Sequence, residues 1–202
     1  MKVSVILGHP RKGSFNHAIA ETVVQTLQEN DCVVMYHDLY EEQFDPVIPF
    51  KEIAKGAELA PTVKMHCDEI ADADGIVIVH PNWWGQPPAI LKGWIDRVIR
   101  AGVAYEFADG DNGEGVPIGL LRAKTAIVFT TSNTVREREL KVFGDPLETL
   151  WKNCIFNLCG VPEVFRKNYE VIVTSTDEQR NAWLQNVRQT VQVHFGKICQ
   201  KQ

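Results

Sequence analysis

Short apolar runs alternate along the chain with segments whose apolar residues recur every three or four positions. A short apolar run flanked by turn residues is typical of a strand covered on both faces of a sheet, and the helical repeat predicts a helix packed against it. The apolar runs predict strands at residues 2–8, 32–37, 75–79, 124–130 and 169–174. The periodic segments predict helices that start near Ser14, cover 53–71 with an interruption near Pro61, follow Pro87 and Pro88, cover 146–158 and begin at Thr176.

Regular alternation of strand and helix predicts an α/β fold, in which a parallel sheet is covered on both faces by helices through right-handed crossovers. Five strands favour a flavodoxin-like three-layer sandwich with the strand order 2-1-3-4-5. A six-stranded dinucleotide-binding sheet would carry GxGxxG after its first strand, and this chain has none there. We expect residues 1–202 to form a single domain. The Gly-rich segment 105–121 is predicted to be a long functional loop.

Charge and cysteine content narrow the class of protein. The formal net charge is -5, with both signs spread along the chain, so neither a nucleic acid nor an anionic membrane is an expected partner. No apolar run approaches the roughly 18 residues of a membrane span, and the first apolar run is too short for a signal peptide. The widely spaced cysteines, without a CxxC pair, predict buried small side chains in a reducing cytoplasm and no metal site.

The first motif, GHPRKGSFN at residues 8–16, joins the first strand to the first helix. The amides at a helix N-terminus, together with the helix dipole, form an anion site. Ser14 either caps the helix or donates to a phosphate, and an ordinary capped turn is the alternative interpretation. His17, inside the helix, is interpreted as structural. The side chains that could bind a phosphate here are His9, Arg11, Lys12, Ser14 and Asn16.

The second motif, HPNWWGQPP at residues 80–88, follows the third strand. Open α/β sheets bind their ligands at the carboxyl ends of the strands. Trp83 and Trp84 place flat apolar surface there, which indicates a planar ligand such as an isoalloxazine ring, unless one of the two is a core residue. The surrounding prolines and Gly85 stiffen the loop and lower the entropy lost on stacking. The solvated face of the next helix is predicted to hold Lys92, Asp96 and Arg97.

The third motif, FTTSNT at residues 129–134, ends the fourth strand. It offers hydroxyls and amides suited to the N1–C2=O–N3 edge of a flavin, although such turns are common. In a parallel sheet the loops after the first, third and fourth strands converge on one edge. The three motifs together therefore indicate a flavin site more strongly than any one alone.

These motifs resemble those of the flavodoxin-like NAD(P)H:quinone oxidoreductase family. Ser14-Phe15-Asn16 looks like the pyrophosphate loop of that family, and PAILKGW at 88–94 looks like its most recognisable stretch. Residues 81–85 occupy the place of its flavin-flanking loop, and AYEF at 104–107 is similar to its AYxY element on the substrate side. The resemblance covers residues 1–135 and continues beyond them only in the order of elements.

The resemblance implies a flavoprotein, with FAD favoured over FMN, that passes hydride from NADH or NADPH to a quinone or nitroaromatic acceptor in a ping-pong reaction. It also implies a homodimer in which residues 105–121 form one wall of the site. Tyr105 and Phe107 would line the substrate side, and Tyr105 and Asn133 are the candidate catalytic residues. The implied cofactor-binding residues are His9, Ser14, Phe15, Asn16, Pro81, Asn82, Trp83, Trp84, Gly85, Thr130, Thr131, Ser132 and Asn133.

Departures from the family leave other functions open. The sequence TTSN at 130–133 replaces a frequent TTGG, and the tyrosine and histidine that assist hydride transfer in the mammalian enzymes have no match. Arg136 and Arg138 would either offset negative charge on a reduced flavin or form a solvated helix face. A flavodoxin-type electron carrier and a flavin-binding regulatory subunit of a transporter are the alternative functions.

Overall fold

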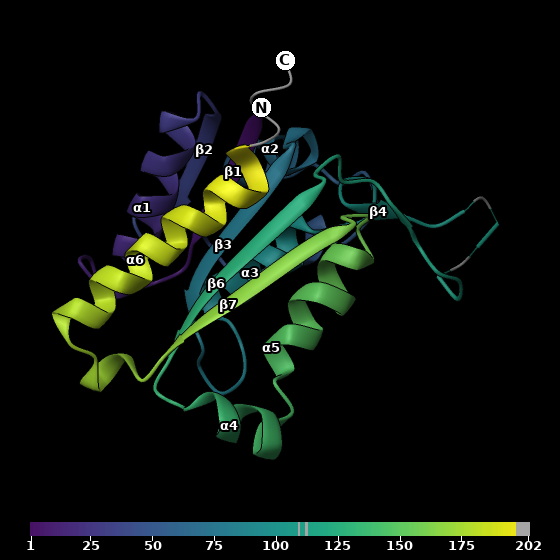
Figure 1. Ribbon diagram of the computed structural model, residues 1–202. Coiled ribbons are helices and arrows are strands. Elements are labelled where there is room, and N and C mark those ends of the chain that lie inside the picture. The colour runs from purple at the N-terminus through teal and green to yellow at the C-terminus, as the bar shows by residue number, and fades with distance from the viewer. Residues whose placement is uncertain (109, 112, 197–202) are drawn as a thin grey trace.

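The computed structural model describes residues 1–108, 110–111 and 113–196. Its strands are β1 (Lys2–Leu7), β2 (Val33–Asp38), β3 (Gly75–Pro81), β4 (Tyr105–Glu106), β5 (Ile118–Gly119), β6 (Thr125–Ser132) and β7 (Glu163–Glu170). Five of them form a sheet in the order β2-β1-β3-β6-β7, in which all neighbouring strands are parallel (Figure 1). With the separate β4–β5 hairpin set aside, this is the predicted order 2-1-3-4-5.

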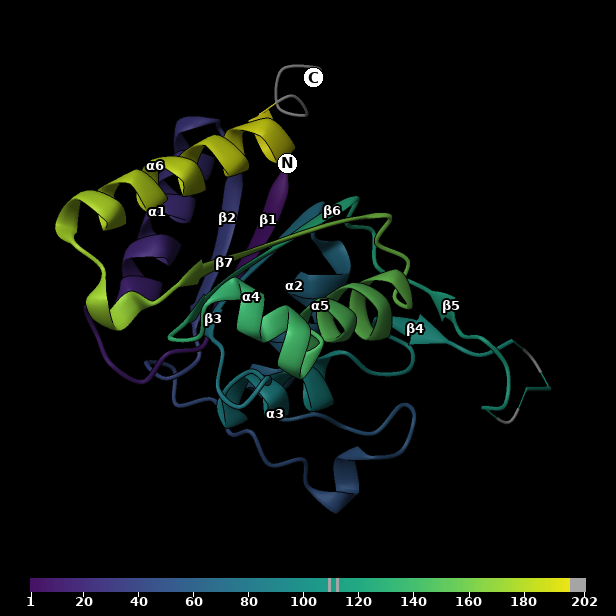
Figure 2. The ribbon, with the colours of Figure 1, turned by 60° about the horizontal axis from the view of Figure 1, so that its bottom comes forward.

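Helices cover both faces of this sheet. They are α1 (Phe15–Glu29), α2 (Pro61–Asp72), α3 (Ala89–Val98), α4 (Arg136–Arg138), α5 (Pro146–Glu148) and α6 (Asp177–Val191); α4, α5 and α6 continue into π-helical turns at Glu139–Phe143, Thr149–Asn157 and Gln192–Gly196. α1 and α6 lie side by side over Val5 and Leu7 of β1 (Figure 2). On the opposite face Ile6 and Ile78 pack against a second core from α2, α3 and the α5 segment. None of the helices in the described ranges is long and apolar enough to cross a membrane.

The fifth strand exists, but its predicted bounds, 169–174, are wrong. The strand β7 ends at Glu170, and Ile172–Thr174 is a 3-10 helix. β7 is an edge strand whose side chains are mostly half-buried and include several charges, so it lacks the continuous apolar run of a central strand. Val171, with a φ of 61°, interrupts the regular backbone between the strand and this helix.

Other predicted boundaries also shift. The predicted helix at 53–71 begins only at Pro61, because a proline at the first helical position needs no amide donor. The segment before it is irregular apart from the 3-10 helix Phe50–Glu52. The predicted loop 105–121 contains the antiparallel β4–β5 hairpin. Ile198, assigned from the sequence to the stripe of the last helix, lies outside the described residues.

A buried ion pair anchors the segment before α2 to α3. Arg97, predicted to be solvated, is only 3% exposed and donates to both carboxylate oxygens of Glu52, itself 1% exposed, at 2.9 and 2.8 Å. It also donates to the carbonyl oxygen of Asp45 at 2.6 Å. The segment approaches so closely that a Cβ on Gly93 would stand 2.2 Å from the carbonyl oxygen of Pro46. Sequence periodicity did not reveal this pair because the segment that covers Arg97 is irregular.

Removal of Glu52 should destabilise the fold far more than removal of an exposed ion pair on the same helix. Glu52→Leu should lower the free energy of unfolding by about 3–5 kcal/mol, because it removes the buried counter-charge of the Arg97 guanidinium and leaves only the exposed carboxylate of Asp45 at 3.3 Å. The matched control is Lys92→Ala, which breaks the exposed Lys92–Asp96 pair on α3 and should cost at most about 0.5 kcal/mol. Urea denaturation measures both values. Equal costs for the two variants would show that Arg97 does not depend on Glu52.

Candidate functional site

A pocket of about 210 Å³ opens at the carboxyl edge of the sheet. The loop between β1 and α1 forms one side, the end of β3 another, and the end of β6 its floor. The sequence motifs after the first, third and fourth predicted strands thus meet, as a parallel sheet requires. The lining residues are His9, Arg11, Ser14, Phe15, Asn16, Pro81, Asn82, Trp83, Thr131, Ser132, Asn133, Ile172 and Val173.

The start of α1 supplies the polar wall of this pocket. Ser14 is the N-cap, and its hydroxyl accepts from the amide of His17 at 3.4 Å. Gly13 precedes it with a φ of 70°, which a side chain would strain. Asn16 is 3% exposed and donates from Nδ2 to Thr131 Oγ1 at 2.9 Å, while its buried Oδ1 has no hydrogen-bond partner within the described residues. A buried amide oxygen left in this state has capacity for a ligand donor.

His9 offers a second polar group. Its Nδ1 accepts from the amide of Arg11 at 3.1 Å, so the hydrogen of the neutral ring lies on Nε2. Burial is the main cause that lowers the pKa of His9 below its ordinary value. The ring therefore stays neutral near pH 7 and presents an N–H donor rather than a charge. The positive charge at this end of the pocket comes from Arg11.

The two tryptophans sit on a tight hairpin and point to different pockets. Trp83 and Gln86 exchange both backbone hydrogen bonds at 3.0 Å, and Trp84 and Gly85 between them both have positive φ, of 57° and 72°. Asn82 Oδ1 secures the turn by accepting from the amide of Gly85 at 2.9 Å. Trp83, 44% exposed, lines the pocket described above. The fully exposed Trp84 and Gly85 instead line a neighbouring apolar pocket, so neither tryptophan is a core residue.

The end of β6 extends further than predicted. The strand runs to Ser132, so Thr131 and Ser132 reach the pocket from the sheet rather than from a loop. Thr130 is fully buried and faces away, where it donates to Asn168 at 3.0 Å. Asn133 is exposed at the rim, and its Oδ1 accepts from the amide of Val173 at 3.0 Å.

Tyr105 and Phe107 are not brought to this pocket within one chain. They belong to the β4–β5 hairpin, which projects from the side of the sheet where β6 and β7 begin (Figures 1 and 2). Backbone bonds fix this position, since Leu121 donates to the carbonyl of Cys159, just before β7, at 3.1 Å. Arg136 and Arg138 are exposed on α4 and also lie outside the pocket's lining.

The polar groove continues beyond the pocket between α1 and α6. A second pocket of about 440 Å³ shares part of the first pocket's lining. Arg180 of α6 lies on it and is held by Ser175 Oγ at 2.8 Å. Sequence reasoning missed this extension together with Ile172 and Val173, because it placed the fifth strand over them. The parallel order itself carried the signal, since the segment after the fifth strand must also reach the carboxyl edge. The lining residues are Arg11, Gly13, Ser14, Phe15, Ala18, Ile172, Asp177, Arg180, Asn181 and Leu184.

Comparison with known proteins identifies the family. The family model for the flavodoxin-like fold matches residues 1–193. The chain belongs to this flavodoxin-like family. A Haemophilus influenzae protein named as an NAD(P)H oxidoreductase is 36% identical to it over 202 residues, which cover 98% of this chain and 97% of the relative.

Two further comparisons agree with the resemblance seen in the motifs. NAD(P)H dehydrogenase (quinone) 1 of Cavia porcellus is 31% identical over 179 residues, and the match covers 77% of this chain but 63% of that enzyme. Among solved structures, the NAD(P)H:quinone oxidoreductase from Methanothermobacter marburgensis superposes with a TM-score of 0.81 at 25% identity and covers 95% of each chain. The predicted family is therefore confirmed.

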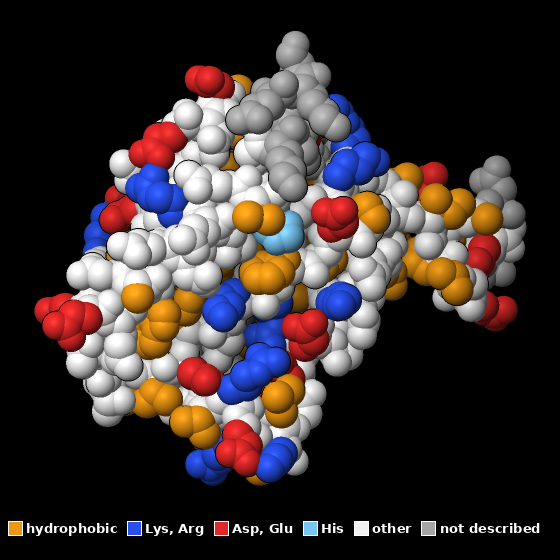
Figure 3. Space-filling model, viewed as in Figure 1, with side chains coloured by type: hydrophobic (Ala, Val, Ile, Leu, Met, Phe, Trp, Pro, Cys, Tyr) orange, Lys and Arg blue, Asp and Glu red, His pale blue; other side chains and the backbone are white. Residues whose placement is uncertain are grey.

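A larger cavity of this flavodoxin-like protein lies elsewhere. A groove of about 670 Å³ follows β7 beside α4 and α5. Arg166 at its base pairs with Asp145 and, at 3.0 Å, with Glu148. In Figure 3 basic and acidic side chains mingle between α6 and the α5 segment, and most of the residues that line the groove are polar or charged, with Phe165 as the aromatic residue of the lining. We therefore place the candidate site in the smaller pocket at the carboxyl edge, because that pocket combines a helix N-terminus with the indole of Trp83.

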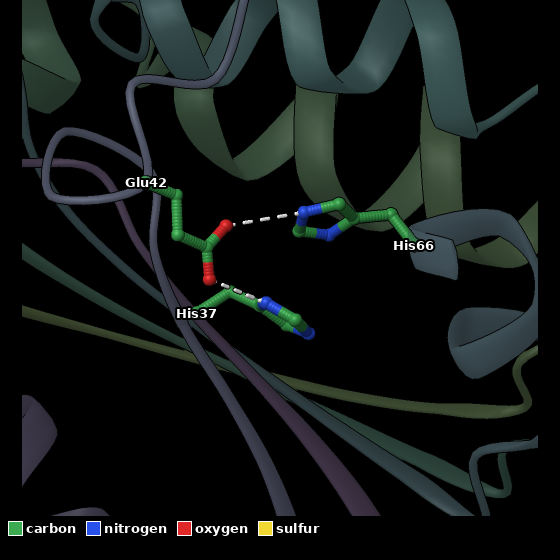
Figure 4. A group of neighbouring side chains, drawn as sticks. All are labelled: His37, Glu42 and His66. Atoms are coloured by element: carbon green, nitrogen blue, oxygen red, sulfur yellow. Dashed lines mark hydrogen bonds and ion pairs between the residues drawn. The ribbon is translucent and has the colours of Figure 1, made fainter. Parts of the chain in front are cut away.

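A cluster of His37, Glu42 and His66 resembles a metal site, with its ligand atoms within 4.8 Å of one another (Figure 4). Its hydrogen bonds argue otherwise. Trp94 Nε1 donates to His66 Nδ1 at 3.2 Å, so Nε2 carries the hydrogen and donates to Glu42 at 3.2 Å. His37 contacts Glu42 at 2.7 Å and Glu69 at 2.5 Å through its two nitrogens, which makes both of them donors. The cluster is an ion-paired hydrogen-bond network that joins the end of β2 to α2.

The pH dependence of stability should reflect this network. Burial disfavours the charged ring of His37, but hydrogen bonds to Glu42 and Glu69 outweigh it and raise its pKa above the ordinary value. Burial would raise the pKa of Glu42, yet hydrogen bonds from His37 and His66 lower it to about 2. Charged His37 stabilises the fold fully below about pH 6.5, and this stabilisation is lost as the pH rises through its raised pKa in the folded state. The ionised Glu42 carboxylate stabilises the fold fully above about pH 4.5, and this stabilisation is lost as the pH falls through its lowered pKa.

His37→Gln should therefore cost most between about pH 4.5 and 6.5, on the order of 1–3 kcal/mol, with a smaller cost at alkaline pH. Chemical denaturation at a series of pH values measures the difference from wild type. Lys64→Gln on α2, which breaks the exposed pair with Asp68, is the control and should cost at most about 0.5 kcal/mol at every pH. A cost of His37→Gln that does not vary with pH would contradict a charged His37.

Proposed function

We propose that this protein is a flavin-dependent NAD(P)H oxidoreductase that passes hydride to a quinone or a similar electrophilic acceptor, with residues 1–202 acting as one domain. One observation carries the proposal. A helix N-terminus and an exposed indole line the same pocket, and so does Asn16, whose buried Oδ1 has no hydrogen-bond partner within the described residues. The named activities of the relatives support it. Buried Cys67 and Cys159 fit a reducing compartment, and we propose the cytoplasm.

The polar half of the groove suits the phosphates of a flavin cofactor. The N-terminus of α1 lies at this half, Ser14 and His9 line it with a hydroxyl and a ring nitrogen, and Arg11 would neutralise charge. The continuation toward Arg180 suits a second phosphate and an adenine between α1 and α6. FMN ends at one phosphate and would leave this part of the groove unused. We therefore propose FAD as the cofactor, with FMN as the alternative.

The other half suits a planar ring. Trp83 offers a flat apolar face, and backbone amides near Ser132 and Asn133 would stabilise negative charge at the pyrimidine edge of the ring. A bound flavin would accept hydride from NADH or NADPH and give it up to the acceptor. Asn133 keeps its Oδ1 on Val173, which leaves its NH₂ group to face the pocket as a donor. No protein nucleophile is needed.

A second copy of the chain would complete this site. The hairpin with Tyr105 and Phe107 lies too far along the sheet to reach its own pocket, and Val116 and Ile118 on it are 90% and 52% exposed. Trp84 is fully exposed beside an apolar pocket, and large exposed apolar groups are characteristic of interfaces. We propose a homodimer in which the hairpin of each copy covers the pocket of the other. A small flat site would accept several quinones and nitroaromatics.

The loop at the start of α1 should control cofactor affinity. Ser14→Ala combined with Asn16→Ala should weaken flavin binding by about 1–3 kcal/mol, because two hydrogen bonds at the groove are lost. Thr22→Ala, on the same helix and outside both pockets, is the control that should bind flavin like the wild type. Fluorescence titration with FAD and with FMN measures the affinities, and chromatography identifies the flavin released by heat. Binding of neither flavin to the wild type would refute the cofactor assignment.

Enzyme and electron carrier are separated by the reductive half-reaction. Stopped-flow mixing with NADH or NADPH should bleach the flavin band, and a quinone should restore it. Tyr105→Ala should raise KM for both substrates together, because both stack at the same wall, while light scattering should report a dimer for the wild type. A flavin band that stays unbleached over minutes would favour the electron carrier. A monomer with flavin bound would exclude a site to which two copies of the chain contribute.

A further inference from the structure

The first turn of α1 carries a hydrogen-bonded chain that the reaction proposed above does not use. Asp38, at the end of β2, lies 3.1 Å from His17 Nε2, and His17 Nδ1 lies 2.9 Å from Ser14 Oγ. All three side chains are buried, with exposed fractions of 6% for Asp38, 8% for His17 and 3% for Ser14. These hydrogen bonds thus connect a buried carboxylate to the Ser14 hydroxyl, which lines the groove.

Asp38 determines which nitrogen of His17 carries a hydrogen. Its Oδ1 accepts from the amides of Tyr40 at 3.1 Å and Glu41 at 3.2 Å, as an ionised carboxylate does. His17 Nε2 is therefore the donor to Asp38 Oδ2. In the neutral ring Nδ1 then has a lone pair and accepts the hydroxyl hydrogen of Ser14.

This neutral arrangement conflicts with a phosphate in the groove. Ser14 Oγ already accepts from the backbone amide of His17 at 3.4 Å, and its single hydrogen is directed to Nδ1. At Ser14 Oγ an anion would therefore meet only oxygen lone pairs. When the ring is doubly protonated, Nδ1 donates to Oγ, and the hydroxyl hydrogen becomes free to donate to a phosphate oxygen.

We propose that His17 is a proton-linked positioning residue: a phosphate group that binds at Ser14 does so with uptake of one proton by the His17 ring. This rests on the proposed function, because it needs a phosphate-bearing cofactor in the groove. Affinity for that cofactor falls as pH rises, since the bound state holds one proton more than the free state. Histidine is suited to the role because its charge changes between about pH 5 and 8.

Other charged groups face this ring. The centroid of the His9 ring lies 6.0 Å from that of His17, and the pKa of His9 is lowered chiefly by burial, so its charge changes at lower pH than that of an ordinary histidine. Arg11 keeps its charge throughout, and Lys12 is paired with Glu41 at 2.6 Å beside Asp38. A variant of His9 is therefore the control that separates the two rings.

The test is the dissociation constant of FAD at a series of pH values from about pH 6 to about pH 8.5, spanning the upper part of the histidine range. FAD is the probe because its diphosphate has no proton to lose there, whereas a phosphate monoester such as that of FMN titrates near about pH 6. Wild-type protein should bind FAD about tenfold more weakly at the top of this range than at the bottom. Calorimetry in buffers of different ionisation enthalpy should report net proton uptake on binding.

Two variants locate the proton. His17→Asn places an amide N–H near the position of Nδ1, where it donates to Ser14 at every pH, so its FAD affinity should not change with pH. His9→Asn should keep the slope of the wild type. A pH-independent wild type, or an unchanged slope in His17→Asn, overturns the coupling while flavin binding stands. Absence of FAD binding at every pH overturns the proposed function instead. Should His17→Asn fail to fold, proton uptake by the wild type decides alone.

Discussion

Burial of both faces of the sheet is the constraint on which the rest of this structure depends. Every residue of β3 and β6 is buried, so along most of their length these strands have no side chain free to meet a ligand, and only their last residues, such as Thr131 and Ser132, line the pocket. Chemistry is confined to the edge where the strands end, and parallel strands all end on the same side. Loops distant in the sequence, at Ser14, Trp83 and Asn133, are thereby gathered into one pocket.

Several buried polar groups in the core are fully paired. Arg97 has Glu52, and His80, whose pKa burial lowers to about 4, donates to the carbonyl of Pro81 and accepts from Trp151. Such pairing offsets the cost of taking polar groups out of water. At the edge Asn16 retains a buried oxygen with no partner within the described residues. Among the described residues, Asn30, Arg100, Asp145 and Glu170 also have a buried side-chain atom without a partner, but of this set only Asn16 lines the pocket at the carboxyl edge.

The hairpin at Trp83 and the first turn of α1 solve different parts of one problem. A tight turn with two positive φ angles fixes an indole as a rigid wall, which lowers the entropy lost when a planar group stacks on it. In the proposed site the helix start would supply donors for the charged part of the same ligand. The hydrogen-bonded residues Asp38, His17 and Ser14 would then set the direction of one of those donors. The position of the planar wall and the orientation of the hydrogen-bond donor are thus set by separate elements of the fold.

The sequence by itself determined the fold class, the strand order and the loops that form the pocket, because these follow from short-range periodicity and the geometry of parallel sheets. It misplaced β7, since an edge strand shows no continuous apolar run, and with it the residues Ile172 and Val173. The sequence pattern also predicted an exposed Arg97, although the residue is buried, because the segment that covers it is irregular. Only the tertiary structure separated Trp83 from Trp84, removed Tyr105 from its own pocket and gave His17 its partners. Directions of side chains and contacts between distant segments depend on packing in three dimensions, which no local pattern encodes.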